Sequence, residues 1–276
     1  MLAALIIVFR EVLEAGIIVG IMLAVTRGIA QRGRWIGGGV AAGALGACLV
    51  AAFAGALASA FAGAGQELFN AAILLVAVVM LTWHNVWMAR HGRELAAEMR
   101  AAGEAVAAGA KSLAGLAVVV GVAVLREGVE VALFLYGVVA ASDPGSGLVI
   151  FAGGVAGLLL GVGTCLLTYL GLLSIPSRHL FAVTTVLIAF LAAGMAAQAV
   201  AFLEQADVVT ALGTIVWNSS RILSDRSMLG RALHTLIGYS DRPTALQFLV
   251  YLATLAVTFA LMKLFAHEPV RQVRTS

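Results

Sequence analysis

The sequence predicts an all-α integral membrane protein with seven transmembrane helices, and three observations support this prediction. Of the 276 residues, 62% are hydrophobic and only 11% are charged, whereas soluble proteins are about half apolar and about a quarter charged. The apolar residues form stretches of about 20 residues or more, the length that crosses the hydrocarbon core. These stretches lack the short alternating pattern of a membrane β-barrel. The composition therefore excludes a soluble domain, a disordered chain and a collagen-like fibre.

Seven stretches bounded by charged residues are long enough to span a membrane. Each is expected to be helical, because backbone groups in lipid must form hydrogen bonds within their own segment. The expected spans are 2–26, 36–62, 67–89, 113–140, 147–173, 179–203 and 244–263. Residues 1–276 then form a single transmembrane domain. Its remaining parts are expected to be a polar cytoplasmic helix at 90–112, an outer interfacial segment at 204–243 and a cytoplasmic tail at 264–276.

The distribution of basic residues predicts the orientation of the chain. Eleven lie on the side that holds the C-terminal tail: Arg27, Arg32, Arg34, Arg90, Arg93, Arg100, Lys111, Arg178, Lys263, Arg271 and Arg274. Four lie on the opposite side: Arg221, Arg226, Arg231 and Arg242. Because lysine and arginine accumulate in cytoplasmic loops, the N-terminus is expected outside and the C-terminus inside the cytoplasmic (inner) membrane. The net charge of +3 gives no indication of nucleic-acid binding, so membrane lipid is the expected surrounding.

Two halves of the chain carry matching motifs. FREVLE at 9–14 corresponds to LREGVE at 125–130, an offset of 116 residues. GGVA at 38–41 recurs at 153–156, an offset of 115 residues. The match predicts two copies of a three-span unit. Because each copy has three spans, the two copies must have opposite orientations in the membrane. Inverted repeats of this kind are common in transporters, where the substrate site lies at the midplane. The expected repeats are residues 1–89 and 113–203, with the seventh span at 244–263 outside them.

Each half places one arginine and two glutamates near the middle of its first span. These residues are Arg10, Glu11 and Glu14 in the first half and Arg126, Glu127 and Glu130 in the second. A charged side chain at the centre of a membrane helix costs about 2.5 to 3.5 kcal/mol. The six side chains are therefore expected to face the interior of the bundle and one another. At about 3.6 residues per turn, the two glutamates of each motif share one face of their helix.

The charge of this cluster favours a bound cation. Ion pairs alone could fasten the helices to one another, but that role needs one acid per base, and here there are two. Four glutamates and two arginines leave a formal charge of −2, which a cation would compensate. Oxygen ligands favour hard metal ions, and the arginines would keep the glutamates ionised.

Further polar residues are candidates for a transport path. His84 could be a ligand or a proton relay, but it lies between two tryptophans near the expected end of its span. An interfacial histidine hydrogen-bonded to a neighbour is therefore the simpler interpretation. Glu67 at the start of the third span, Gln198 in the sixth span and Glu204 just after it could line the outer approach to the site. Solvation at the membrane edge explains most of these positions equally well.

The paired motifs resemble the signature of the oxidase-dependent family of high-affinity ferric iron permeases, which includes bacterial EfeU-like proteins. That signature is two intramembrane R-E-x-x-E motifs, here at 10–14 and 126–130 in the first and fourth of seven spans. The resemblance implies ferric iron as the substrate and no cofactor beyond the transported iron. It also implies a partner on the outer side, an iron oxidase or a periplasmic iron-binding protein. The iron ligands it implies are Glu11, Glu14, Glu127 and Glu130.

Three other functions fit some of these observations. A permease for another metal cation, such as lead or a divalent ion, would keep the same architecture. A membrane-embedded di-iron enzyme is disfavoured, because such bundles use Glu-x-x-His pairs and the sequence contains none. A passive subunit that only holds an oxidase would not need a repeated charged motif at mid-membrane depth. A non-enzymatic metal permease is therefore the prediction.

Overall fold

The structure, a computed structural model, describes residues 1–60, 66–142, 145–171, 177–225 and 227–266. Its helices are α1 (Leu2–Val25), α2 (Arg32–Ala60), α3 (Gln66–Ala107), α4 (Leu113–Ala140), α5 (Gly147–Tyr169), α6 (Ser177–Gln205), α7 (Met228–Ile237) and α8 (Ala245–Ala266). Apart from their end residues, the seven predicted spans coincide with helices wherever the chain is described. The predicted span ends at 61–62 and 172–173 and residues 267–276 of the predicted tail lie outside the described residues.

Five helical segments in the described part of the chain are long and apolar enough to cross a membrane. They are Arg32–Ala56, Gln66–Met88, Gly147–Tyr169, Phe181–Gln205 and Ala245–Phe265. α1 and α4 are of similar length, with 24 and 28 residues, but each carries the three charged residues of its motif. These three charges, and not a lower apolar content of the rest of the helix, distinguish α1 and α4 from the five segments.

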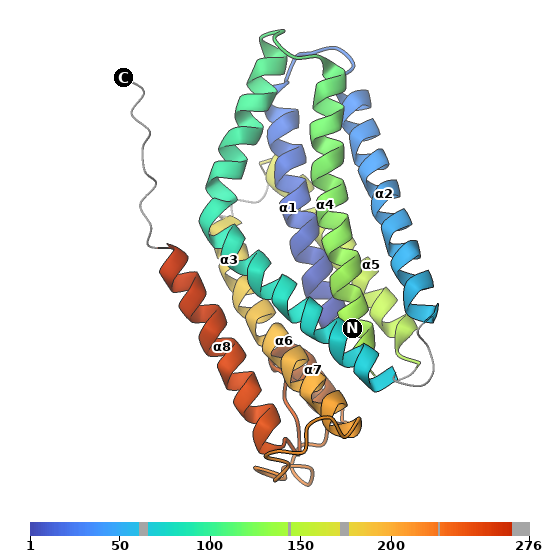
Figure 1. Cartoon of the computed structure of the whole chain (residues 1–276). Helices are drawn as coiled ribbons and strands as arrows, with labels where there is room; N and C mark the ends of the chain where they lie inside the picture. The colour runs from blue at the N-terminus through green and yellow to red at the C-terminus, as the bar shows by residue number, and fades with distance from the viewer. Residues whose placement is uncertain (61–65, 143–144, 172–176, 226, 267–276) are drawn as a thin grey trace.

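The two motif-bearing helices lie side by side at the centre of the bundle and run in opposite directions (Figure 1). α5 packs along α1, and α2 packs along α4. α3 and α6 pack on one another, and α8 covers them from outside. The charged motifs therefore face other helices, as the cost of charge in hydrocarbon favours, and the Arg126 side chain, at 38%, is the most exposed of the six.

Glycines allow α2 to approach α4 closely. A Cβ atom added to Gly43 would lie 2.5 Å from the carbonyl oxygen of Gly121 and 2.9 Å from the amide nitrogen of Leu125. A Cβ atom on Gly39 would likewise overlap the carbonyl oxygen of Ala117. Small residues spaced by four bring helix backbones together in this way.

The contact between α5 and α1 has the same pattern. A Cβ atom on Gly157 would lie 2.5 Å from the carbonyl oxygen of Leu5 and 3.0 Å from the amide nitrogen of Phe9. A Cβ atom on Gly153 would overlap the carbonyl oxygen of Met1. Each of these α5 glycines lies 114 residues after its counterpart in α2. The backbone atoms that the α2 glycines approach in α4 lie 116 residues after those that the α5 glycines approach in or next to α1.

Two apolar layers enclose the charged motifs along the bundle. One is built from α1, α3, α4 and α6 and includes Ile7, Leu81 and Phe134. The other includes Met22 and Val120, together with residues of α2 and of the distal part of α3. On α1 and on α4 the charged residues lie between the two layers in sequence. The charged residues thus form a polar layer between two apolar layers of the bundle.

The prediction of a separate polar helix at 90–112 was wrong in its bounds. α3 continues from Gln66 to Ala107 without a break in its helical hydrogen bonds, and Figure 1 shows it changing direction about midway. α3 contains no proline, and its two glycines, Gly92 and Gly103, each cost a helix only about 1 kcal/mol. The chain turns after Ala107, with Gly109 in the left-handed conformation at φ 74°. One face of this part of α3 packs against α1 and α4, and its described charges are exposed, as predicted: Glu94, Glu98, Arg100 and Glu104.

The segment at 204–243 contains a short helix that the sequence analysis did not predict. α7 begins after Ser227, whose hydroxyl accepts a hydrogen bond from the Gly230 amide at 2.9 Å. It ends at Gly238, which adopts the left-handed conformation at φ 68° and approaches the backbone of Gly194. At 10 residues α7 is too short to span a membrane. It packs against α6 and the start of α1, so this segment returns to the bundle.

Candidate metal centre

The first motif is fully buried on α1. Arg10 and Glu11 each retain 1% of their accessible surface. Nη1 of Arg10 lies 3.2 Å from Oε1 of Glu11, and Nη2 lies 2.9 Å from Oε1 of Glu14. The second oxygen, Oε2, of each glutamate is buried and has no hydrogen-bond partner among the described residues. Arg10 therefore neutralises one oxygen of each carboxylate and leaves the other available.

The second motif, on α4, is less enclosed. Nε of Arg126 donates a hydrogen bond to Oε1 of Glu130 at 3.2 Å and lies 3.9 Å from Oε1 of Glu127. Glu127 is buried, and its Oε2 has no hydrogen-bond partner in the described chain. The Arg126 side chain is 38% exposed, and its guanidinium lies over the Trp87 ring, 4.4 Å from the centroid. Equivalent motifs thus have unequal surroundings.

The structure brings the two motifs together across the α1–α4 contact. One carboxylate oxygen from each of Glu11, Glu127 and Glu130 lies within 4.8 Å of the others. A second group of the same compactness joins Glu11 and Glu14 with His84. Glu11 belongs to both groups, so the four motif glutamates form one continuous cluster. Carboxylates at this spacing repel one another unless a cation or proton lies among them.

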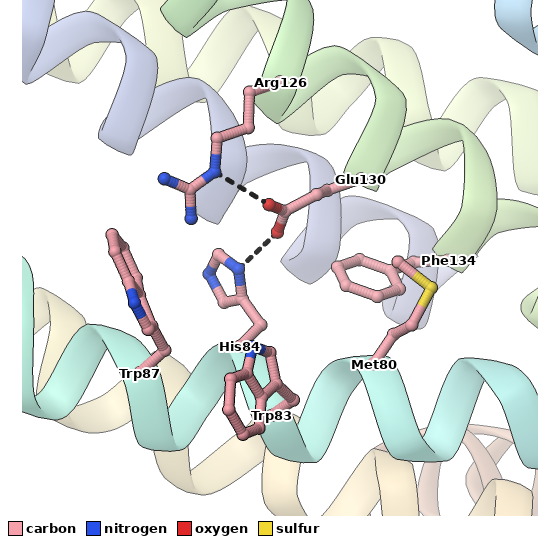
Figure 2. A pocket seen from close by; sticks show the side chains of 7 residues that line it. All are labelled: Met80, Trp83, His84, Trp87, Arg126, Glu130 and Phe134. Atoms are coloured by element: carbon pink, nitrogen blue, oxygen red, sulfur yellow. Dashed lines mark hydrogen bonds and ion pairs between the residues drawn. The ribbon is translucent and has the colours of Figure 1, made fainter.

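His84 of α3 lies within this cluster, and the interfacial position expected for it was wrong. Its side chain is only 4% exposed. Nδ1 contacts Oε2 of Glu130 (Figure 2). Nε2 lies 3.5 Å from Oε1 of Glu14 and 3.9 Å from Oε2 of Glu11. The position of His84 near the end of the apolar span, which runs over Gln66–Met88, suggested an interfacial side chain. α3 instead continues to Ala107 and packs against α1 and α4, so His84 lies between the two motif-bearing helices.

A cavity of about 310 Å³ opens beside this histidine. It is lined by Met80, Trp83, His84, Trp87, Arg126, Glu130 and Phe134, whose side chains come from α3 and α4 (Figure 2). The Phe134 ring meets the His84 ring edge to face at 6.3 Å. The cavity is therefore lined by Glu130 and by His84, whose ring connects Glu130 to the first motif.

Asn85 is a buried polar residue that the sequence analysis did not consider. It is 1% exposed, and its Nδ2 donates to the carbonyl oxygen of Thr185 on α6 at 3.5 Å. Its Oδ1 has no hydrogen-bond partner among the described residues. A polar side chain adjacent to His84 in an apolar span was the signal for it. Asn85 connects α3 to α6 behind the charged cluster.

The structure does not gather the other candidate path residues around the cluster. Glu67 is exposed in the first turn of α3. Gln198 lines a separate small cavity with His234 of α7 and the start of α1. Glu204 accepts hydrogen bonds from Thr244 and Gln247, both at 2.7 Å, and so joins the end of α6 to the start of α8.

Comparison with known proteins identifies relatives over nearly the whole chain. The model of the "Iron permease FTR1 family" matches residues 1–272. The "Ferrous iron permease EfeU" of Shigella sonnei (strain Ss046) is 32% identical over 270 residues, which are 95% of this chain and 96% of that protein. The protein of the same name from Yersinia pestis is 30% identical over 255 residues, covering 91% and 89%. No solved structure matches the chain significantly.

These matches cover both motif-bearing helices and the helices that enclose them. Together with its several apolar helices, they make the chain a multi-pass membrane protein. They also place it among transporters rather than enzymes, so the di-iron enzyme considered above is set aside. The protein belongs to the iron permease FTR1 family.

Proposed function

We propose that this protein carries iron across the membrane through a site formed by Glu11, Glu14, Glu127 and Glu130. The observation that carries the proposal is that each motif glutamate has a buried carboxylate oxygen without a hydrogen-bond partner in the described chain: Oε2 of Glu11, both oxygens of Glu14, Oε2 of Glu127 and Oε2 of Glu130. A buried carboxylate oxygen left without a partner is costly. A cation bound among these oxygens would remove that cost.

The two arginines fit this role because they stabilise the glutamates without a metal ion. Arg10 and Arg126 together compensate two of the four carboxylate charges. The remaining formal charge of −2 attracts a cation, but it is small enough to allow the cation to leave. Such a balance is what a transport site requires, because a cargo held too tightly is not released.

The architecture that we propose is an inverted repeat of three plus three spans with a seventh span added. Residues 1–89 and 113–203 form the repeats, and α8 is the addition. The matched glycine contacts support it: α2 approaches α4 as α5 approaches α1, with constant offsets of 114 and 116 residues. The opposite directions of α1 and α4 are in keeping with inversion.

Alternating access by movement of one repeat against the other is the mechanism that fits this architecture. The two apolar layers on either side of the charged residues would open in turn, one toward each side of the membrane. We place the N-terminus outside and the C-terminus inside the cytoplasmic membrane, because the basic residues predominate on the side of the C-terminal tail. Inward movement of a cation is then favoured by about 2.3 kcal/mol per charge for each 100 mV.

Ferric iron is the cargo that the oxygen-rich site favours, because hard cations prefer oxygen ligands. Relatives are named ferrous iron permeases, so the ferrous ion is the alternative. Ferric iron would reach the site from an iron oxidase or a periplasmic iron-binding protein on the outer side, the partner that we expect.

The test is uptake of radioactive iron into liposomes that contain the purified protein. Iron is supplied either as a ferric chelate or as ferrous ion kept reduced by ascorbate. The double variant Glu11→Gln/Glu127→Gln should lose at least about 90% of uptake, whereas Glu94→Gln/Glu98→Gln, an equal charge change on an exposed face of α3, should retain it. Normal uptake by a correctly inserted double variant would overturn the proposal. The form of iron that is taken up identifies the cargo.

A further inference from the structure

We infer that His84 is a direct metal ligand through Nε2 and that it selects iron over Mg²⁺, Ca²⁺ and Mn²⁺. This inference rests on the proposed function. The four motif glutamates offer only oxygen, and oxygen sites suit Mg²⁺, Ca²⁺ and Mn²⁺ as well as iron. An imidazole nitrogen favours iron over those ions.

The orientation of the ring is the first support. Nδ1 of His84 contacts a carboxylate oxygen of Glu130. A carboxylate accepts and does not donate, so this contact places a proton on Nδ1 and directs the lone pair of Nε2 away from Glu130. Metal-binding histidines are commonly oriented by a carboxylate in this way. Glu130 therefore positions the ring.

The surroundings of Nε2 are the second support. This atom is buried and has no hydrogen-bond partner among the described residues. It lies 3.5 Å from Oε1 of Glu14 and 3.9 Å from Oε2 of Glu11. Ligand atoms of these three residues lie within 4.8 Å of one another, which is the separation of atoms around a single ion. A ring held only for packing would not need to direct its free nitrogen at two carboxylates.

The sharing of Glu11 is the third support. Glu11 joins the group that contains His84 to the oxygen-only group with Glu127 and Glu130. An ion can therefore pass between the two groups without leaving the cluster. The group of Glu11, Glu14 and His84 is the discriminating one, because it alone contributes nitrogen.

A spectroscopic experiment tests the ligand assignment directly. The full-length protein in detergent is loaded anaerobically with ferrous ion, and X-ray absorption is recorded at the iron edge. Wild-type protein should show the multiple scattering of a bound imidazole, and His84→Gln should lose it. His91→Gln should keep it, because His91 is on the same helix but stacks on Trp87, 5.1 Å between ring centres. Iron bound to wild-type protein without an imidazole signal, or with one that persists in His84→Gln, would overturn the inference.

An uptake experiment tests the selectivity. Ferrous uptake into liposomes is measured with a hundredfold excess of Mn²⁺. Wild-type protein and His91→Gln should lose less than half of their uptake, whereas His84→Gln should lose at least about 90%. Equal competition in all three proteins would overturn the inference. Wild-type protein that binds neither ferrous nor ferric ion would contradict the proposed function itself, whereas bound iron without imidazole contradicts only the role of His84.

Discussion

The guanidinium of Arg126 lies 4.4 Å from the centre of the Trp87 ring, an arrangement that has no counterpart at the buried Arg10 among the described contacts. The aromatic face attracts the guanidinium and competes with the motif glutamates for it. Trp87 thus adjusts how strongly Arg126 neutralises the second motif. Trp87 of α3 thus makes the ion pairing of the second motif differ from that of the first.

Replacement of Trp87 by leucine should weaken iron binding by about twofold to about thirtyfold, because a cation–π contact contributes about 0.5 to 2 kcal/mol. Released from the ring, Arg126 would pair more closely with Glu130 and oppose the metal ion. The dissociation constant of ferrous ion in detergent measures the effect. Trp87→Phe should lose less affinity. Trp83→Leu serves as the control in the same cavity, and an equal loss in that variant would exclude a specific role for Trp87.

The two motif arginines should differ in their contribution to stability. Arg10→Gln leaves two buried carboxylates without their ion pairs, and breaking a buried pair costs about 3 to 5 kcal/mol. Arg126→Gln should cost clearly less, because that side chain is 38% exposed. Thermal unfolding of both variants in the same detergent provides the comparison. Equal shifts in melting temperature would show that the difference in burial has no energetic consequence.

Glycine replacements should destabilise both helix contacts to a similar degree. Gly43→Ala and Gly157→Ala each place a Cβ atom 2.5 Å from a backbone oxygen, and overpacking of this kind costs about 1 to 3 kcal/mol. Gly38→Ala and Gly163→Ala are matched controls, because no heavy atom lies within 4 Å of a Cβ at either position. Thermal unfolding is again the measurement. Destabilisation at only one of the two interfaces would argue against their equivalence.

A carboxylate pair in the segment between α6 and α8 should make stability depend on pH. Oδ1 of Asp225 accepts a hydrogen bond from the Asp241 amide at 3.0 Å. Partial burial, with the nearby charge of Asp241, raises the pKa of Asp225 above 3.8. The folded chain then binds more protons than the unfolded chain between the two pKa values, so stability falls as pH rises through that interval.

Asp225→Asn should therefore raise the melting temperature at pH 7, and the gain should disappear as the pH approaches 3.8. The asparagine oxygen still accepts the Asp241 amide. Solvent screens this site, so the gain is below about 1 kcal/mol. Glu67→Gln, an exposed charge at the start of α3, should leave the pH profile unchanged. A gain that persists at low pH would contradict this account.

The predicted spans agree closely with the helices because the signal was local. Apolar stretches with charged ends specify where a helix must run in lipid, whatever its neighbours are. The span that was predicted to end at residue 89 agrees with the apolar segment Gln66–Met88, but a separate helix after it was wrong because a change from apolar to polar residues was taken as a helix end. α3 instead continues into water with one packed face and one charged face. α7 was missed because a helix of 10 residues is stabilised here by packing on α6 and α1 rather than by its own length.

The sequence alone determined the class of protein, the helical spans and the four glutamates that form the candidate site, because charge inside an apolar span is unusual enough to be recognised without a structure. Only the tertiary structure decided that His84 joins Glu11, Glu14 and Glu130. It also decided that the first motif is buried while Arg126 remains partly exposed beside Trp87. The physical reason is that these contacts join residues of different helices, and their geometry depends on how closely glycines allow the helices to approach.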